Sequence, residues 1–271
     1  MDFVPDTVID RLLRELAEEQ NDLLGVVQDL GEDGFNLPTP ALGWDLGDQI
    51  VHLAFFDRVA TKAIAHGEEF AQMAQALEAD PHHFDRSIRM LRALPCLEIL
   101  AELKAARDEF IEVARAHPGK SIQWFGPPMK TESMVTARLM ETFAHGVDIR
   151  DALNEPLTVA ERHLDVVYLG YRTVAHSFAL HGLAKPEGDI EIEVKMPDNS
   201  IISVGVATID ANGEENRVSG SLGDLALIVV QRRNRHDLDL VVTGIFARAW
   251  VEIAQAYAGP PGEGRHSLKT S

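Results

Sequence analysis

The chain has 271 residues, of which 25 are Lys or Arg and 43 are Asp or Glu, so its formal net charge is −18. An apolar fraction of 45% and a charged fraction of 25% are typical of a folded globular protein rather than a disordered one. The acidic excess argues against binding to nucleic acids or to anionic membrane surfaces, because both require clustered Lys and Arg. The single cysteine, Cys96, excludes an intrachain disulfide and a cysteine-rich zinc site.

The first residues show no signal-peptide pattern, and no apolar run approaches the ~18 residues that a membrane-spanning helix needs. We therefore expect a cytoplasmic protein with neither a nucleic acid nor a membrane as its partner.

Apolar residues recur at helical spacing in four long segments of the first half of the chain. The predicted helices cover residues 6–30, 45–65, 97–116 and 131–153. Asp6 and Thr131 have side chains suited to capping the first and the last of them. Four long helices with connections of uneven length predict a four-helix bundle over residues 1–155.

The second half has a mixed pattern, which predicts an α+β domain over residues 156–262. Residues 190–196 alternate apolar and polar side chains, as a half-buried strand does. Further strands are expected at 201–207 and 238–243, and helices at 158–180, 222–230 and 247–257. A disordered tail is expected at 263–271.

Glu141 and His145 are four residues apart, so they project from one face of the predicted helix. Together with Arg138 and Asp148 they form a polar stripe. Because the opposite side of this helix has no strong apolar face, part of the stripe is expected to face inward. A buried charge must be paired or bound to a metal ion, since an unpaired one is very costly.

His52 is the third candidate ligand, because it lies in an otherwise apolar helical segment. With Glu141 and His145 it would make a set of two histidines and one carboxylate. Zinc accepts such ligands at ~2.0–2.2 Å and in catalytic sites keeps a fourth position for water or substrate. Iron and nickel accept the same ligands, so the spacing does not choose the metal. A histidine hydrogen-bonded within the core is the alternative interpretation of His52.

Two further groups of residues are candidates for supporting roles around these ligands. Asp48 and Asp148 lie close to His52 and His145 in the sequence and are candidates to orient the imidazoles. Arg138 is suited to binding a substrate carboxylate or to pairing with a nearby glutamate. Trp44 and Trp124 are candidates for the walls of a pocket, with core packing as the alternative. No residue is assigned a catalytic role.

Two segments carry a resemblance to a known family. Residues 40–53 (PALGWDLGDQIVHL) resemble the second-helix motif of the DinB-like metalloprotein superfamily, and more closely the metal-binding domain of mycothiol-dependent maleylpyruvate isomerases. Residues 136–149 (TARLMETFAHGVDI) resemble the second metal motif of that group. Residues 124–129 and 218–261 are similar to an actinobacterial branch of it. The resemblance covers nearly the whole chain and implies metal ligation by His52, Glu141 and His145.

The resemblance also implies a fold and an activity. The fold is a DinB-like four-helix bundle followed by a smaller sterol-carrier-like α+β domain. The activity is that of a mycothiol-dependent transferase or isomerase, in which a divalent metal, zinc first and nickel or iron as alternatives, activates a thiol. The partners are then a low-molecular-weight thiol, mycothiol, and a small electrophilic or unsaturated substrate.

Two other classes of function stay open at this point. The chain is also consistent with a metal-containing protein that binds a lipid or small molecule without turnover, or with a metal that has a purely structural role. The sequence does not define the oligomeric state, for which a homodimer is one alternative.

Overall fold

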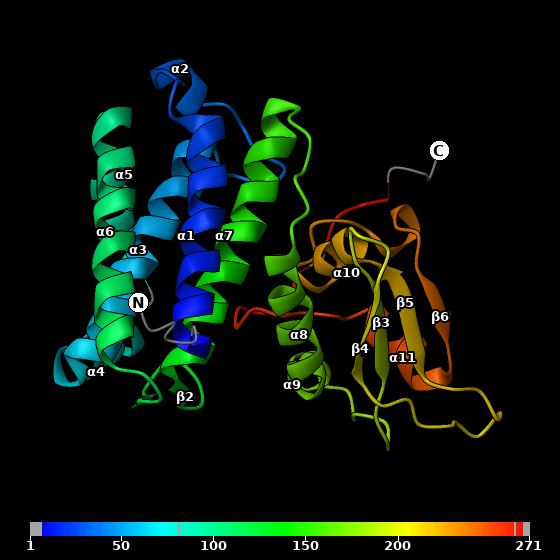
Figure 1. Ribbon diagram of the computed structural model, residues 1–271. Coiled ribbons are helices and arrows are strands. Elements are labelled where there is room, and N and C mark those ends of the chain that lie inside the picture. The colour runs from blue at the N-terminus through cyan, green and yellow to red at the C-terminus, as the bar shows by residue number, and fades with distance from the viewer. Residues whose placement is uncertain (1–6, 81, 263, 268–271) are drawn as a thin grey trace, which may run out of the picture. The chain divides into compact units, whose positions relative to one another are not determined.

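The structure, a computed structural model, describes residues 7–80, 82–262 and 264–267. The chain divides into two compact units, Met1–Leu157 and Thr158–Ser271. The first unit is mainly helical and the second combines helices with a sheet (Figure 1). The fold class is therefore mixed α and β.

Four long helices lie alongside one another in the first unit (Figure 1). They are α1 (Val8–Val27), α3 (Leu46–Ala65), α6 (Cys96–Ala116) and α7 (Thr131–Leu153). α3 packs against both α6 and α7, and α1 packs against α7. The predicted helices are confirmed, and α3, α6 and α7 begin and end within one residue of the expected bounds.

The helix caps differ from those expected. Asp6 lies outside the described residues, and Thr7 is the N-cap of α1, where its hydroxyl accepts a hydrogen bond from the amide of Asp10. The prediction that Thr131 caps α7 was wrong, because Lys130 is the N-cap. The Thr131 hydroxyl instead donates to the carbonyl of His117 at 2.8 Å, which joins the end of α6 to the start of α7.

Five short elements of this unit were not predicted: α2 (Glu32–Phe35), α4 (Gly67–Ala79), α5 (His83–Arg92), β1 (Ser121–Ile122) and β2 (Met129–Lys130). α4 mixes small and polar residues around few large apolar ones, and α5 is mostly polar. Arg92, at the end of α5, donates to the carboxylate of Asp45 at 2.7 Å. Asp45 is the N-cap of α3, so this ion pair fastens α5 to the start of α3.

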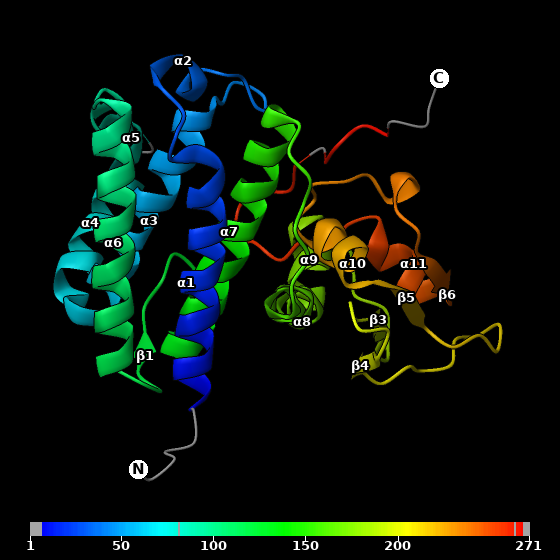
Figure 2. The same cartoon turned by 45° about the horizontal axis from the view of Figure 1, so that its top comes forward.

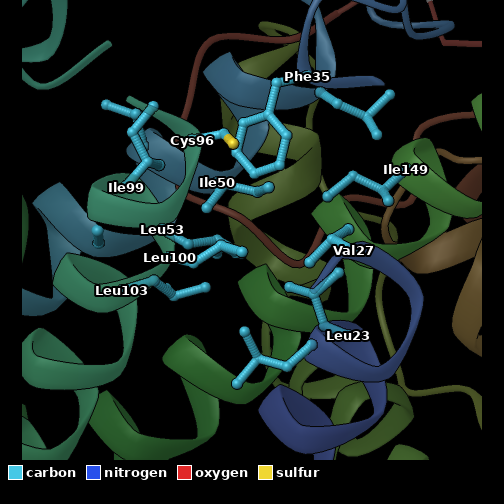
Figure 3. Packing of buried hydrophobic residues seen from close by; sticks show 14 of the residues in the cluster. Leu23, Val27, Phe35, Ile50, Leu53, Cys96, Ile99, Leu100, Leu103 and Ile149 are labelled. Carbon is cyan, nitrogen blue, oxygen red and sulfur yellow. The ribbon is translucent and has the colours of Figure 1, made fainter. Parts of the chain in front are cut away.

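Buried apolar side chains from all four long helices meet in one core cluster (Figure 3). Leu23 and Val27 come from α1, and Ile50 and Leu53 come from α3. Leu100 and Leu103 of α6 and Ile149 of α7 complete the contacts in the same cluster. This packing fixes α3 and α7 relative to each other, and these two helices carry the candidate metal ligands.

The second unit contains a four-stranded sheet in the order β4-β3-β5-β6. Its strands are β3 (Glu191–Lys195), β4 (Ile201–Gly205), β5 (Arg217–Ser221) and β6 (Val241–Thr243). β3 pairs with β5 in parallel, and the other neighbours are antiparallel. Helices α8 (Leu164–Arg172) and α10 (Leu222–Val229) pack against each other and against strands of the sheet (Figure 2).

The prediction of one continuous helix over 158–180 was wrong. The segment forms the short 3-10 helix η1 (Glu161–His163), α8 and α9 (Val174–Leu180). The break falls at Thr173, whose hydroxyl donates to the distant carbonyl of Gln255 at 2.9 Å. The strands predicted at 190–196, 201–207 and 238–243 are present but shorter.

The end of the second unit also differs from expectation. Helix α11 (Ile245–Val251) stops before 257, because the backbone N–H and C=O of Gln255 both bond to the hydroxyl of Ser177. A further 3-10 turn, η2 (Arg235–Asp237), was not predicted. Of the tail expected to be disordered, residues 263 and 268–271 lie outside the described residues, whereas the carbonyl of Arg265 accepts a hydrogen bond from Asn234.

Within the residues that the structure describes, no helix has both the length and the apolar character needed to cross a membrane.

Candidate metal centre

α3 and α7 bring His52, Glu141 and His145 into one group. One potential ligand atom from each residue lies within 4.8 Å of the other two. Glu141 Oε2 is 3.3 Å from His145 Nε2 and 3.9 Å from His52 Nε2. The two imidazole rings have their centroids 4.5 Å apart. The structure therefore brings His52 together with Glu141 and His145, which follow it by about 90 residues in the sequence.

These separations fit the donor geometry of a small divalent cation. Two ligand atoms at the usual distance from a tetrahedral zinc ion are ~3.3–3.6 Å from each other. The measured 3.3 and 3.9 Å lie close to that range. Two imidazole nitrogens and one carboxylate oxygen suit zinc, iron and nickel alike, so the geometry does not select among these metals.

The carboxyl group of Glu141 is suited to act as an anionic ligand. Its side chain is 25% exposed. Burial raises the pKa of this group, but the hydrogen bond to His145 and the nearby positive charges of His145, His52 and Arg138 lower it, to about 2 overall. Glu141 is thus ionised across the neutral pH range.

Aromatic rings surround the two histidines. The Trp44 ring stacks on His145, with centroids 5.8 Å apart and an interplanar angle of 21°. The centroid of the Trp44 ring also lies 5.2 Å from that of the His52 ring, and the Phe56 ring lies 4.6 Å from the same His52 ring. Because these rings are large and apolar, they restrict water around the imidazoles and limit their rotation.

Gln49 is a buried residue of the centre that the sequence reasoning missed. Its Oε1 atom accepts a hydrogen bond from Nδ1 of His145. A signal for it exists in the sequence, because Gln49 is polar, lies in the apolar helix α3 and precedes His52 by three residues, which places both on the same face.

Arg138 lies in the core rather than in an open position beside the ligands. Its Nε atom donates to Asp57 Oδ1 at 2.7 Å, and its Nη2 atom donates to the carbonyl of Leu53 at 3.1 Å. The other oxygen of Asp57 accepts from Nε of Arg107, also at 2.7 Å. Because its N–H groups are bonded to a buried carboxylate and a backbone carbonyl, Arg138 is poorly placed to bind a substrate carboxylate.

Asp48 and Trp124 contact residues other than the three candidate ligands. Asp48 completes the capping box of α3, where its side chain accepts from the amide of Asp45 at 3.0 Å. Asp148 is fully buried on α7. Trp124 stacks on Phe70, with an interplanar angle of 9° and centroids 5.5 Å apart. Of the residues predicted to support the site, Trp44 is in ring contact with both histidines.

Comparisons with known proteins give the family of the chain. The family model described as the mycothiol maleylpyruvate isomerase N-terminal domain matches residues 16–150. Two uncharacterized proteins of Mycobacterium tuberculosis, from strains CDC 1551 / Oshkosh and ATCC 25618 / H37Rv, are each 39% identical to the chain over 253 residues. That alignment covers 93% of this chain and 96% of each relative.

Two solved structures share the fold. The crystal structure of the mycothiol-dependent maleylpyruvate isomerase has a TM-score of 0.58 at 13% identity, with 86% of this chain and 92% of the other covered. A histidine-to-alanine mutant of that enzyme has a TM-score of 0.60 at 12% identity, with 89% and 95% covered. The family match and the fold agree with each other, and the chain belongs to the DinB-like family of mycothiol maleylpyruvate isomerase-like proteins.

Proposed function

We propose that this protein is a metal-dependent enzyme that activates mycothiol, or a similar small thiol, for addition to a small electrophilic or unsaturated substrate. The observation that carries the proposal is the grouping of His52, Glu141 and His145 within 4.8 Å. The family match and the shared fold support the choice of thiol, because the solved relative is a mycothiol-dependent isomerase.

The ligand set has a charge suited to a thiol. Imidazoles must be neutral to ligate a metal, so the set would supply one negative charge, that of Glu141, and leave a divalent cation with a net charge of about +1. When bound, the cation lowers the pKa of a thiol at its remaining coordination position and favours the nucleophilic thiolate. We propose zinc as the metal, since three protein ligands with a further position for substrate are typical of catalytic zinc sites.

In this proposal the aromatic residues of the centre position the imidazoles and shield them from water. Trp44 and Phe56 cover the imidazoles and exclude water from one side of the ligands. The chain's own thiol has a different environment, because Cys96 is buried and its Sγ atom lies 3.9 Å from the carbonyl of Leu30. Burial raises the pKa of the Cys96 thiol, which favours its unreactive form. A separate thiol is therefore part of the proposal.

The finer description of the fold belongs to the same proposal. We propose that the four long helices form a DinB-like four-helix bundle and that the second unit is a sterol-carrier-like domain. Domain bounds of 1–155 and 156–262 follow from the sequence pattern. The contacts of α3 with α6 and α7, and of α1 with α7, support the first part of this description.

The function is tested with mycothiol and a halogenated nitroarene as the electrophile. Mass spectrometry is used to follow the mycothiol adduct, and elemental analysis is run on the same protein preparations. We expect about one metal ion per wild-type chain and adduct formation above the uncatalysed rate. His52→Ala should lose both, because it removes one of the three ligands.

His66→Ala is the matched control, since His66 is exposed at the C-terminal end of the same helix. It should keep the metal and the activity. A wild-type protein that holds metal but forms no more adduct than His52→Ala would contradict the enzymatic proposal and favour a structural role for the metal.

A further inference from the structure

A chain of three hydrogen bonds runs from a loop to one of the candidate metal ligands. The Thr39 hydroxyl donates to the backbone carbonyl of Trp44 at 2.9 Å. The same hydroxyl oxygen accepts from Nε2 of Gln49, also at 2.9 Å. Oε1 of Gln49 then faces Nδ1 of His145. We propose that Gln49 and Thr39 are positioning residues of the metal centre, which hold His145 with its Nε2 lone pair directed at the cation.

The direction of each hydrogen bond follows from the first one. The carbonyl of Trp44 can only accept, so the Thr39 hydroxyl must be the donor. The oxygen of Thr39 is then left as an acceptor, which requires the NH₂ group of Gln49 to face it. The amide oxygen of Gln49 consequently points at His145. Because an amide oxygen can only accept, Nδ1 of His145 must carry a proton.

The protonation of Nδ1 leaves Nε2 as the nitrogen that binds a metal. Nε2 is the atom that lies 3.3 Å from Glu141 Oε2, within the candidate centre. Histidine ligands of metals commonly donate their other N–H to a neighbouring acceptor, which fixes the ring in one orientation. Gln49 meets this requirement from a fully buried position on α3.

Trp44 contacts the same imidazole and is bonded to the same threonine. Its carbonyl receives the Thr39 hydroxyl, while its ring stacks on His145. The imidazole is thus held at its edge by Gln49 and on its face by Trp44, and both are connected through Thr39. The loop before α3 is kept in place by a backbone hydrogen bond from Thr39 to Trp44 and by the capping box of Asp45.

The inference rests on the metal site of the proposed function, and its test uses metal binding as the readout. Zn²⁺ affinity is measured by competition with a chromophoric chelator, and Co²⁺ is used as a spectroscopic probe of the ligand geometry. Gln49→Leu removes the acceptor, and we expect it to weaken Zn²⁺ binding by ~10–100-fold and to change the visible Co²⁺ spectrum. Gln49→Glu keeps an acceptor oxygen and should restore most of the affinity and the spectrum.

Two further variants separate positioning from packing. Thr39→Val removes the partner of the Gln49 amide and the hydroxyl donor to the Trp44 carbonyl but leaves Gln49 Oε1 in place, so its loss of affinity should be smaller than that of Gln49→Leu. Gln20→Leu is the matched control, because Gln20 is buried in the same unit and its side-chain oxygen has no hydrogen-bond partner among the described residues. It should leave both metal readouts unchanged.

Wild-type affinity and spectrum in Gln49→Leu would overturn the inference, as would an equal loss in Gln20→Leu. If Gln49→Leu does not fold, a loss in Thr39→Val with full binding by Gln49→Glu still supports the inference, and wild-type binding by Thr39→Val refutes the connection through the loop. A wild-type chain that binds neither Zn²⁺ nor Co²⁺ would instead remove the metal site itself, and with it the proposed function.

Discussion

Arg138 and Glu141 lie nearly one turn apart on α7, and their partners give them different roles. The guanidinium of Arg138 is hydrogen-bonded to Asp57, whereas the Glu141 carboxylate faces two imidazoles. A carboxylate paired directly with a guanidinium keeps its charge, but the N–H donors of the guanidinium occupy its oxygens. Because Asp57 takes this place, Glu141 stays available to bind a cation.

Tyr171 gives a pH-dependent prediction at the scale of a single residue. Its hydroxyl donates to Asp189 Oδ2 at 2.7 Å, and this hydrogen bond, burial and the negative charge of Asp189 raise the pKa of Tyr171 to about 12. The folded state thus holds this proton more tightly than the unfolded state, whose tyrosine pKa is ~10. The resulting stabilisation is complete below about pH 10 and is lost as the pH rises towards about 12.

The measurement is the free energy of unfolding in urea between pH 8 and 11.5. We expect the difference between the wild type and Tyr171→Phe to shrink as the pH rises, because only the wild type loses this interaction. A wild-type minus Tyr171→Phe difference that is the same at pH 8 and 11.5 would show that the Asp189 contact is absent in solution.

The sequence led to the candidate metal ligands because their chemistry is distinctive. Glu141 and His145 share one helical face, His52 lies in an otherwise apolar helical segment, and the resemblance implied all three. Thr39 has no such signal and Gln49 has a weak one, because amides and hydroxyls occur at many structural positions. Their role depends on a loop that folds back on α3, and that geometry is not encoded in any spacing.

At the scale of secondary structure, local pattern predicts long amphipathic helices well and short elements poorly. β5 has the sequence RVSGS, which is polar and contains glycine, so it gives little strand signal. It becomes a strand because β3 pairs with it in parallel and β6 pairs on its other side. The break between α8 and α9 likewise depends on a partner, since the Thr173 hydroxyl bonds to the carbonyl of Gln255, 82 residues away.

A buried cluster of charged residues joins the three long helices α3, α6 and α7. Asp57 of α3 accepts from Arg107 of α6 and from Arg138 of α7, and Arg107 also donates to Thr142 of α7 at 3.0 Å. All three charged side chains are at most 4% exposed. Removal of the shared carboxylate would leave two guanidinium groups buried without their partner. We expect Asp57→Asn to cost ~3–5 kcal/mol in the free energy of unfolding.

Chemical denaturation of the metal-free protein measures this cost. Glu102→Gln is the matched control, because Glu102 also bonds an arginine of α3, Arg58, at 2.7 Å, but both side chains are about a third exposed. Its effect should be ~0–1 kcal/mol, as for most surface ion pairs. Similar losses in the two variants would mean that the buried cluster is solvated in solution.

At the scale of the whole molecule, the two compact units are retained together in relatives. The 39% identity to the Mycobacterium tuberculosis proteins extends over 93% of the chain, so it includes both units. The fold of the solved isomerase also covers most of this chain at 13% identity. Both units therefore belong to the architecture of the family, although the candidate metal ligands all come from the first.

This distribution of ligands predicts how metal binding affects unfolding of the full chain. A ligand that binds only the native state stabilises the part that it binds, by ~2.7 kcal/mol at a free concentration 100 times its dissociation constant. For a unit of this size we expect Zn²⁺ to raise one calorimetric transition by about 5–10 °C and to leave a second one in place. His145→Ala should show no shift, because it lacks one ligand. If the wild type instead shows a single transition that Zn²⁺ raises, the two units unfold as one cooperative body, and the stabilisation by the metal extends beyond the helices that bind it.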